Sequence, residues 1–472
     1  MITHVKIDGF KSFVNFEMNF TPFTVIAGPN ASGKSNLFDA LKLLSDLSHT
    51  DLKNAFRNQR GDAKELFTQY SSKEYASQMY FYVEMLLDKE IKDSWGGKST
   101  LKYTRLKYSL KISREKNKDG IDELFINEET LEPIKHQQDL WVKEYIPNQT
   151  RDFWRPKVPV GKRGKPYIYT DMRNGIPTIK LAQDGKRGGK ETPANTVTRT
   201  VLSGIDDVGF PHAFGAREEM RNWNFLQLNP DDLRRPTKKE MGMSDIITQS
   251  GENIAAALFR IQSEDNYVLK EVSRKLNNIL PNLTEVNVMD DVANNQYVIK
   301  VTSDDNKIYS SQVLSEGTLR LLTLCIFLYD DTHKNLLCYE EPENGIHPFR
   351  IKFLTRLLND LSVDFDDTEN PLRQILVNTH SPVLVKEIIN WKGDSRVSVW
   401  FSQLTTLITD IKKEKIKINI TRIVPVVKDI SEEQLKIRFP DLSLNESEIK
   451  LTLATVNRYL VTTDMEQISI PL

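Results

Sequence analysis

The stretch Gly28-Pro29-Asn30-Ala31-Ser32-Gly33-Lys34-Ser35 decides how this chain folds. It fits the pattern G-x-x-x-x-G-K-[ST], in which glycines let the backbone wrap closely around a chain of phosphates. The apolar run 24–27 precedes it, and a stretch with helical spacing, 36–47, follows it. This order predicts a buried strand, a phosphate-binding loop and a helix whose N-terminus attracts negative charge.

The residues of this loop have distinct expected roles. Backbone N–H groups surround the phosphates, Lys34 reaches the β- and γ-phosphates, and the hydroxyl of Ser35 ligates Mg²⁺. The alternative is a chance Gly-Lys-Ser turn, and the strand before the loop and the helix after it argue against that alternative. The predicted nucleotide-binding residues are Gly28, Pro29, Asn30, Ala31, Ser32, Gly33, Lys34, Ser35 and Asn36.

A second motif, Asn335-Leu336-Leu337-Cys338-Tyr339-Glu340-Glu341-Pro342, brings two carboxylates to the end of an apolar strand. Ligands of open α/β sheets bind at this end of the strands. Adjacent strand residues point to opposite sides, so one carboxylate can face a metal ion and the other an attacking water. Alone, the pair is as easily a solvated strand end. Beside a phosphate-binding loop it predicts hydrolysis.

Two further segments are ambiguous by themselves. Ser315 and Gly317 open an apolar helix, and Ser315 can cap its N-terminus, which attracts anions. An ordinary capped core helix explains that segment equally well. His380 ends the apolar strand 375–379 beside a Ser-Pro turn, where a lone histidine is usually structural.

The composition excludes some classes and leaves others open. The 472 residues carry a net charge of −1, so global charge says nothing about nucleic acid. Cys325 and Cys338 lie in apolar runs, which indicates buried, reduced thiols. The longest apolar run, 321–329, is too short to span a bilayer, and the N-terminus has no apolar signal core. We expect a soluble, cytoplasmic protein without a membrane partner.

Periodicity indicates the remaining elements. Alternating apolar residues predict strands at 5–7 and 16–20, and exposed antiparallel strands at 79–85 and 106–112. Helical spacing returns at 268–279, and strands are expected at 287–288, 297–301 and 397–401. From 312 to 379 the order helix, strand, helix, strand is typical of a parallel α/β arrangement.

Taken in order, the four motifs resemble the ABC-type ATPase family, most closely its RecF-like and OLD-like (overcoming lysogenisation defect) branch. The run 340–348, Glu-Glu-Pro-Glu-Asn-Gly-Ile-His-Pro, is similar to that of this branch, and 7–13 is similar to its first strand and turn. Clear resemblance covers about 1–45 and 310–385. It implies an α/β fold: a P-loop ATPase head with a mixed or parallel sheet flanked by helices, an antiparallel β subdomain and a largely α/β insertion.

The resemblance also implies a division of the chain and roles for its residues. The expected ATPase core is 1–50 and 251–390, the inserted lobe is 51–250, and a small α/β extension is 391–472. Cofactors are ATP and Mg²⁺, and at least two copies share composite sites. The resemblance implies that Glu340 holds Mg²⁺ through water and that Glu341 is the general base. Ser315 and Gly317 would contact the γ-phosphate of ATP bound to the other subunit, and His380 would sense that phosphate. Residues 343–347 would form the loop across the dimer interface, and the Q-loop glutamine would be either Gln69 or Gln78.

Three departures from the family pattern refine this expectation. Glu340 stands where most ABC ATPases have Asp, and Leu-Ser-Glu-Gly-Thr at 314–318 replaces the transporter form of that motif. After Pro382 there is no strand-end Glu-Gly with a later Asp-x-Asp, so we expect no TOPRIM nuclease, which OLD proteins carry. The leading hypothesis is the ATPase subunit of a bacterial defence or toxin–antitoxin-like system with a separate nuclease or toxin as effector.

Two alternatives stay open at this point. A DNA-repair or chromosome-maintenance ATPase like RecF or an SMC head is one, although 37–314 contains no heptads. A transporter subunit is the other, and the long separation of Ser35 from Ser315 argues against it. Operon neighbours would separate the classes.

The segment 151–190 is a candidate contact for nucleic acid. It holds eleven Lys or Arg residues against three Asp, and it is rich in proline and glycine, so we expect a loop. Cations there can neutralise phosphates while aromatic faces stack bases. A solvated loop or a docking site for an acidic protein are the competing interpretations. The residues proposed for these contacts are Phe153, Trp154, Tyr167, Tyr169, Lys162, Arg163, Lys186 and Arg187.

Overall fold

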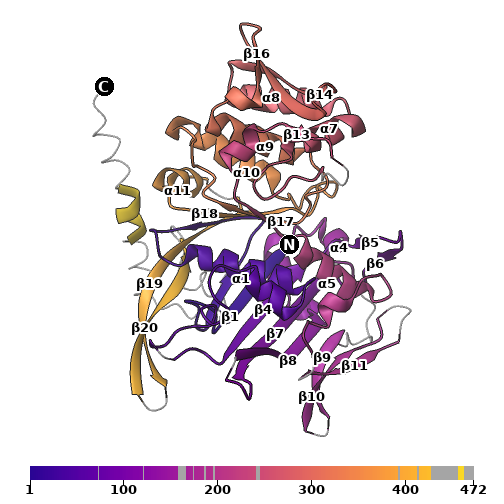
Figure 1. Ribbon diagram of the computed structural model, residues 1–472, viewed down its shortest axis with the longest axis vertical. Coiled ribbons are helices and arrows are strands. Elements are labelled where there is room, and N and C mark those ends of the chain that lie inside the picture. The colour runs from indigo at the N-terminus through magenta and orange to yellow at the C-terminus, as the bar shows by residue number, and fades with distance from the viewer. Residues whose placement is uncertain are drawn as a thin grey trace. The chain divides into compact units, whose positions relative to one another are not determined.

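The chain forms two compact units. Unit 1 consists of Met1–Trp223, Asp364–Leu372 and Ser395–Asn457, and unit 2 consists of Asn224–Val363, Arg373–Asp394 and Arg458–Leu472 (Figure 1). The computed structural model describes residues 1–72, 74–120, 122–157, 166–173, 175–184, 188–194, 197–240, 245–391, 394–411, 414–426 and 455–461.

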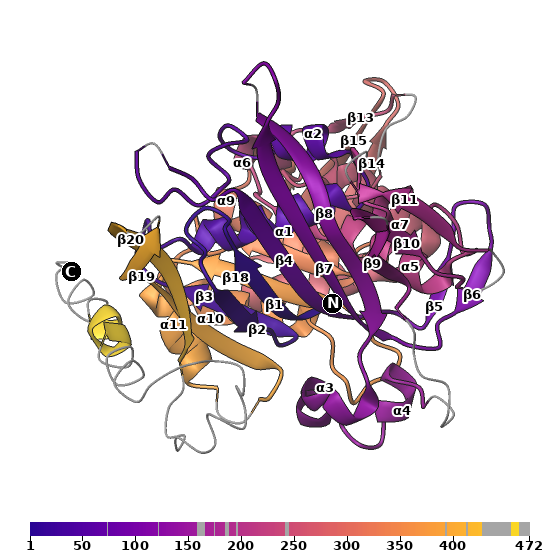
Figure 2. The ribbon, with the colours of Figure 1, turned by 90° about the horizontal axis from the view of Figure 1, so that it is seen from below.

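Unit 1 contains a large antiparallel sheet. Its strands follow the order β11-β10-β9-β8-β7-β4-β1-β2, and Figure 2 shows several of them crossing the view side by side. Apolar side chains alternate along β4 and β7, which buries one face of each strand. The bounds are β1 Ile2–Asp8, β2 Phe16–Asn19, β4 Gln78–Leu86, β7 Arg105–Lys116, β8 Asp122–Pro133, β9 Ile168–Arg173, β10 Ile176–Leu181 and β11 Lys190–Pro193; a separate hairpin pairs β5 Glu90–Lys92 with β6 Lys98–Thr100.

A second set of strands in unit 1 carries the predicted phosphate-binding loop. β3 (Phe23–Ala27) is buried throughout and pairs in parallel with β19 (Val397–Ile411), which pairs antiparallel with β20 (Glu414–Pro425). Residues 374 positions apart therefore lie side by side in the pair Ala27 and Phe401. The helices of this unit are α1 Lys34–Leu47, α2 Leu52–Arg57, α3 Leu140–Tyr145, α4 Arg151–Trp154 and α5 Pro211–Arg221, with 3-10 turns η1 His136–Gln138 and η3 Leu202–Gly204.

Unit 2 contains parallel strands flanked by helices. β17 (Leu336–Glu340) pairs in parallel with β12 (Asn224–Leu226) and with β18 (Gln374–Thr379), and both long strands are buried apolar runs, as parallel sheets require. Its helices are α6 Pro230–Arg234, α7 Ile254–Glu264, α8 Val268–Ile279, α9 Glu316–Leu328, α10 Ile351–Leu361 and α11 Pro382–Ile389, with η4 Ser311–Val313 and η5 Pro348–Arg350; an antiparallel sheet joins β13 Thr237–Lys238, β14 Leu283–Asp291, β15 Gln296–Ser303 and β16 Ile308–Ser310.

The predicted fold class is confirmed, because parallel strands with flanking helices and an antiparallel sheet are all present. The expected ranges do not coincide with the two units: strands of the range 51–250 share one sheet with β1 and β2, and β19 of the range 391–472 pairs with β3. The division into core, inserted lobe and extension stays a prediction.

Both cysteines are free and buried as expected, and burial raises the pKa of the Cys325 thiol to about 12.

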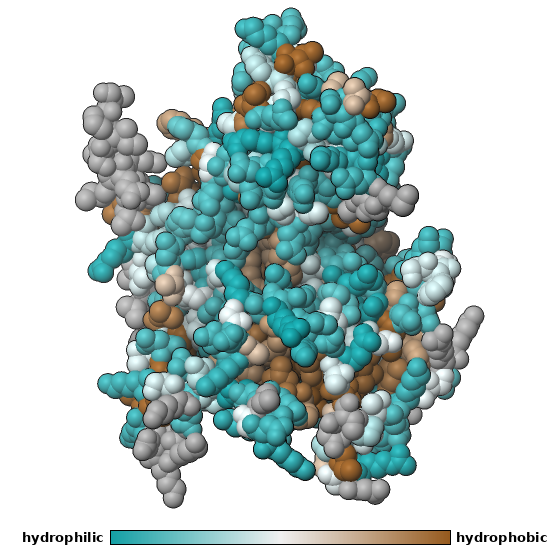
Figure 3. Space-filling model, viewed as in Figure 1, coloured by the Kyte–Doolittle hydropathy of each residue, from teal (hydrophilic) through white to brown (hydrophobic). Residues whose placement is uncertain are grey.

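Polar residues cover most of the face seen in Figure 3, and apolar residues gather there over the strands of the large antiparallel sheet. The β14 to β16 sheet also has exposed apolar side chains: Val292, in the turn between β14 and β15, is 78% exposed, and Ile308, which pairs with Thr302 toward the other end of β15, is 67% exposed. Within the described part of the chain, no helix combines the length and apolar character needed to cross a membrane.

A buried cluster of charges ties the large sheet to α3 and the end of α4. Arg105 on β7 donates from Nε to Asp139, from NH1 to Thr3 Oγ1 (2.7 Å) and from NH2 to Glu84 (3.2 Å). Arg155 forms a second ion pair with Asp139, at 2.8 Å. Burial alone would raise the pKa of Asp139, but the two guanidinium groups lower it below its usual value. Asp139 thus pairs with both buried cations, and Glu84 is a second partner for Arg105.

Replacing Asp139 by alanine should destabilise unit 1 by about 3–5 kcal/mol, because the buried Arg155 loses the carboxylate that pairs with it and the buried Arg105 keeps only Glu84. The folded-state pKa of Asp139 is depressed, so its stabilisation is present at neutral pH and is lost as the pH falls through that value. Urea denaturation at neutral pH measures the change.

Asp122→Ala is the matched control, because Asp122 pairs with Arg114 at 3.6 Å nearer the surface. Its free energy of unfolding should change by less than about 1 kcal/mol. Equal effects of the two substitutions would show that the Asp139 cluster is not a stabilising centre.

Candidate functional site

The loop 28–35 lies in unit 1 between the buried strand β3 and helix α1, as the sequence predicts. Gly33 caps α1 with a φ of 90°, and Ala31 also has a positive φ, 62°. These turns leave the first N–H groups of a fourteen-residue helix at the loop, which is the geometry that attracts phosphate.

Two hydroxyl groups of the β19–β20 hairpin donate hydrogen bonds to the backbone of the loop. Ser402 on β19 donates to the carbonyl oxygen of Ser32 (2.9 Å), and Thr421 on β20 donates to the same oxygen (3.3 Å). A Cβ on Gly33 would lie 1.8 Å from Oγ1 of Thr421, so only glycine allows this approach. No short-range pattern in the sequence points to Ser402 or Thr421, because they lie far along the chain.

The charged and polar groups of the loop fit a phosphate chain. Lys34 is 7% exposed, and its ammonium donates to the carbonyl oxygens of Gly28 and Pro29, both at 2.8 Å. Ser32 Oγ is buried and has no partner among the described residues. A cation at the loop and an unsatisfied hydroxyl inside it are what an anionic ligand would satisfy.

Asn36 has a different placement from the rest of the predicted binding set. Its side-chain amide donates to Ser12 Oγ (2.8 Å), and that hydroxyl lies 2.6 Å from Thr421 Oγ1. The Asn36 side chain therefore belongs to the hydrogen-bond network that supports the loop.

The two Q-loop candidates, Gln69 and Gln78, both lie in unit 1 and are exposed.

The other three motifs lie in unit 2. β17 and β18 run in parallel with Glu340 opposite Asn378, so their carboxyl ends meet at one edge of the sheet. Glu341 follows β17 and His380 follows β18, and the structure brings them together: Nδ1 of His380 donates to Oε1 of Glu341 (3.1 Å). Their side chains are 40% and 42% exposed, which leaves them accessible to a ligand.

The turn after β17 contains residues for which the sequence suggested no individual role. Asn344 Nδ2 donates to Oε2 of Glu341 (2.8 Å). Thr379 Oγ1 donates to Oε1 of the buried Glu343 (2.5 Å), whose pKa is raised by burial. The run Glu-Glu-Pro-Glu-Asn contains both residues, so the signal was present, but only the turn geometry reveals the contacts.

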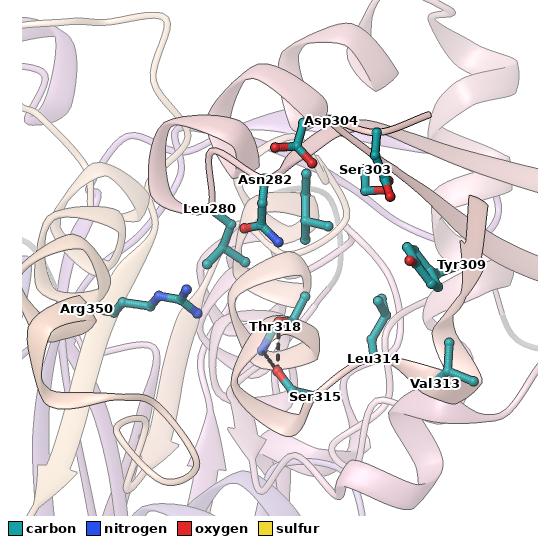
Figure 4. Close-up of a pocket in the computed structure, with 12 residues that line it drawn as sticks. Leu280, Asn282, Ser303, Asp304, Tyr309, Val313, Leu314, Ser315, Thr318 and Arg350 are labelled. Carbon is teal, nitrogen blue, oxygen red and sulfur yellow. Dashed lines mark hydrogen bonds between the residues drawn. The ribbon is translucent and has the colours of Figure 1, made fainter. Parts of the chain in front are cut away.

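Ser315 caps α9 as predicted. Its Oγ accepts a hydrogen bond from the backbone N–H of Thr318 (3.3 Å) and lies 2.8 Å from Thr318 Oγ1. Figure 4 shows Ser315 and Thr318 on the wall of a cavity of about 420 Å³, with Arg350 on another element beside it. A Cβ on Gly317 would lie 2.4 Å from the carbonyl oxygen of Gly345, so this glycine lets the turn after β17 pack against the start of α9.

The segment 151–190 differs from the loop that its composition suggests. It contains the short helix α4 and adds β9 and β10 to the large sheet. Trp154 and Tyr167 are 6% and 8% exposed, and Tyr167 stacks on His212 with ring centres 4.4 Å apart. The prediction that these two rings stack bases is wrong, because they pack in the core. Lys162, Arg163, Lys186 and Arg187 lie outside the described residues.

Gly33→Ala should abolish nucleotide binding, because its Cβ would collide with Thr421 and push the loop away from β20. Titration with a fluorescent ATP analogue measures the loss. Gly120→Ala is the matched control: Gly120 also has a positive φ (76°), but a Cβ there meets nothing within 4 Å. Both variants carry the backbone strain, so equal affinities would refute the role of the close approach.

Solved structures provide distant similarities. An Smc head bound to the C-winged helix domain of ScpA is 11% identical, with 89% of this chain and 98% of that chain covered and a TM-score of 0.46. The SMC head domain from Thermotoga maritima is 13% identical, with 90% and 99% covered and a TM-score of 0.36. An Smc head with an extended coiled coil, bound to the C-terminal domain of ScpA derived from Pyrococcus furiosus, is 13% identical, with 93% and 98% covered and a TM-score of 0.43. TM-scores this low assign no function.

The family comparison is more informative. None of the curated proteins compared with the chain matches it. The family described as "AAA domain, putative AbiEii toxin, Type IV TA system" matches residues 23–386, which is more than half of the chain and includes all four motifs. This match agrees with the phosphate-binding loop between β3 and α1 and with the parallel strands that end in Glu340 and Thr379. The chain therefore belongs to this family of AAA-domain proteins and has a P-loop ATPase fold.

Proposed function

We propose that this protein binds ATP and hydrolyses it to ADP and phosphate. The observation that carries the proposal is the loop 28–35. Gly33 is packed against Thr421, Lys34 donates to two carbonyl oxygens of the loop, and Ser32 Oγ is buried without a partner among the described residues. Membership of a family described by an AAA domain supports the same activity. We assign it to the cytoplasm, the compartment that supplies ATP.

The paired carboxylates supply the chemistry of hydrolysis in this proposal. Glu341 acts as the general base that takes a proton from the attacking water, and His380, hydrogen-bonded to Glu341 at 3.1 Å, responds to the γ-phosphate. The partial exposure of both side chains supports these roles, because substrate has to reach them.

The residues also suit a magnesium ion. The resemblance to ABC-type ATPases supports two ligands for Mg²⁺: the hydroxyl of Ser35, at the start of α1, and, through water, the carboxylate of Glu340, at the end of β17. The ion would neutralise charge on the phosphates. Oxygen ligands of these two types are what Mg²⁺ prefers in phosphate sites, with water completing its shell.

We further propose that two copies of the chain share each site. Ser315 and Gly317 of one copy would contact the γ-phosphate bound to the other, as the resemblance to ABC-type ATPases implies. The capped N-terminus of α9 supports this, because its free N–H groups and its dipole favour an anion.

The biological setting belongs to the same proposal. The family description names a toxin and a type IV toxin–antitoxin system, which favours the role of an ATPase subunit in a bacterial defence or toxin–antitoxin-like system. Such a subunit of the OLD-like branch would couple ATP turnover to a separate effector, such as a nuclease or toxin. Deleting the adjacent genes and testing for phage resistance and growth arrest would check this setting.

Glu341→Gln should retain ATP binding and lose hydrolysis by about 10² to 10⁴-fold, because the glutamine cannot accept the proton. Phosphate release and analogue binding measure the two properties. Glu285→Gln, a carboxylate change at an exposed position on β14, is the control and should keep the wild-type rate. Lys34→Ala should lose binding instead. Wild-type turnover by Glu341→Gln would mean that another group is the base.

Mixing two inactive proteins tests the shared site. Ser315→Arg blocks one half of the site and Lys34→Ala blocks the other, so a mixed dimer retains one intact composite site. Random mixing should restore roughly a quarter of the wild-type ATPase rate, since about half of the dimers are mixed. Mixed dimers that are verified by differential tags and yet stay inactive would contradict a site built from two copies.

A further inference from the structure

The turn that follows β17 has an unusual backbone. Glu341 has a φ of 48°, in the left-handed region that residues with a side chain rarely adopt. Its N–H donates to the carbonyl oxygen of Asn378 (2.8 Å), and its own carbonyl oxygen accepts from the N–H of Asn344 (3.1 Å). The strained conformation turns the Glu341 side chain away from the strand direction and brings residue 344 back beside it.

The carboxylate of Glu341 is held at both oxygens. Oε1 accepts from His380 Nδ1 (3.1 Å), and Oε2 accepts from Asn344 Nδ2 (2.8 Å). A glutamate that is 40% exposed would otherwise sample several rotamers, because burial does not fix it. Each oxygen has two acceptor positions, so one on each stays available to a water molecule.

The loop that carries Asn344 is anchored independently of Glu341. Glu343 is 9% exposed, and its Oε1 accepts from Thr379 Oγ1 (2.5 Å). Thr379 Oγ1 in turn accepts the N–H of Ser381 (2.9 Å), which fixes the residues on both sides of His380. Ile346 N–H donates to the carbonyl oxygen of Glu343 (3.0 Å). Asn344 is therefore a donor on a rigid turn.

We propose that Asn344 is a positioning residue for the general base, an inference that rests on the proposed function of Glu341. Its amide fixes Oε2 so that the carboxylate faces the attacking water, while His380 fixes the other oxygen. The contribution comes from geometry, because a base that rotates away from the water loses the alignment that in-line attack requires. Asn344 acts only through Glu341.

Asn344→Ala should lower kcat for ATP hydrolysis by about 10- to 100-fold, the effect of one lost hydrogen bond to a charged group. KM for ATP and the affinity for a non-hydrolysable analogue should stay unchanged, since the phosphate-binding loop is intact. Hydrogen exchange should still protect the Glu341 amide, whose bond to Asn378 does not involve the Asn344 side chain. Asn344→Asp keeps the volume but cannot donate when ionised, so it should lose at least as much activity.

Asn294→Ala is the matched control. Asn294 Nδ2 donates to Asp291 Oδ2 (2.8 Å), also three residues earlier in a turn, but on the exposed β14–β15 hairpin. Losing that bond should leave kcat, KM and analogue binding at wild-type values. A similar loss of kcat in both variants would overturn the specific role of Asn344.

A double-mutant cycle supplies the decisive readout. If Asn344 acts only through Glu341, then Asn344→Ala should add no further loss to the residual rate of Glu341→Gln. If the double variant loses activity by the product of the two single losses, the two residues act independently and the proposal is overturned. A raised KM with unchanged kcat in Asn344→Ala would also overturn it. Wild-type kcat in Asn344→Ala, with Glu341→Gln inactive, would refute this inference alone. Full turnover by Glu341→Gln would instead refute the proposed base. If Asn344→Ala is destabilised, the isosteric Asn344→Asp is used in its place to test the inference. Its hydrolysis rate is then divided by the amount of protein that binds the analogue.

Discussion

The carbonyl oxygen of Ser32 is the contact on which the phosphate-binding loop depends. A loop that turns its N–H groups toward a ligand has to point carbonyl groups elsewhere, and a carbonyl buried without a donor is costly. Here two hydroxyls, Ser402 and Thr421, donate to that oxygen from neighbouring strands of one hairpin. Gly33 permits the approach, since any side chain would collide with Thr421. These two hydrogen bonds restrain the loop, and a restrained loop loses less conformational entropy when it binds a ligand.

A comparable constraint operates at the ends of β17 and β18 in unit 2. The parallel register sets Glu340 opposite Asn378, and the two turns that follow are joined by Glu341–His380 and Glu343–Thr379. Both acidic residues are held by donors from the neighbouring turn, one at the surface and one in the core. Buried strands fix the positions of the turns, while the side chains of Glu341 and His380 stay accessible to solvent.

Several parts of the fold could be predicted because their signals are local. The period-two pattern of β4 and β7, the helical spacing of α8 and the apolar runs of β17 and β18 each reflect burial of one face or of both. The segment 151–190 could not be predicted in this way. Its prolines, glycines and cations suggest a loop, yet β9 and β10 form by pairing, and Tyr167 is buried because His212, distant in sequence, stacks on it.

By itself the sequence determined which chemical groups are available. They are a predicted phosphate-binding loop, two carboxylates after a buried strand, a capped helix and a histidine after a second strand. These motifs are short, and each one's local geometry follows from residue type and spacing. Only the tertiary structure decided their supports. Strand pairing places Ser402 and Thr421 against the loop. The turns after separate strands bring Gly317 against Gly345 and allow Asn344 and His380 to donate to Glu341. Most of these contacts join residues that lie far apart in the sequence, so no sequence pattern specifies them. The Asn344–Glu341 contact spans only three residues, but it depends on the geometry of the turn.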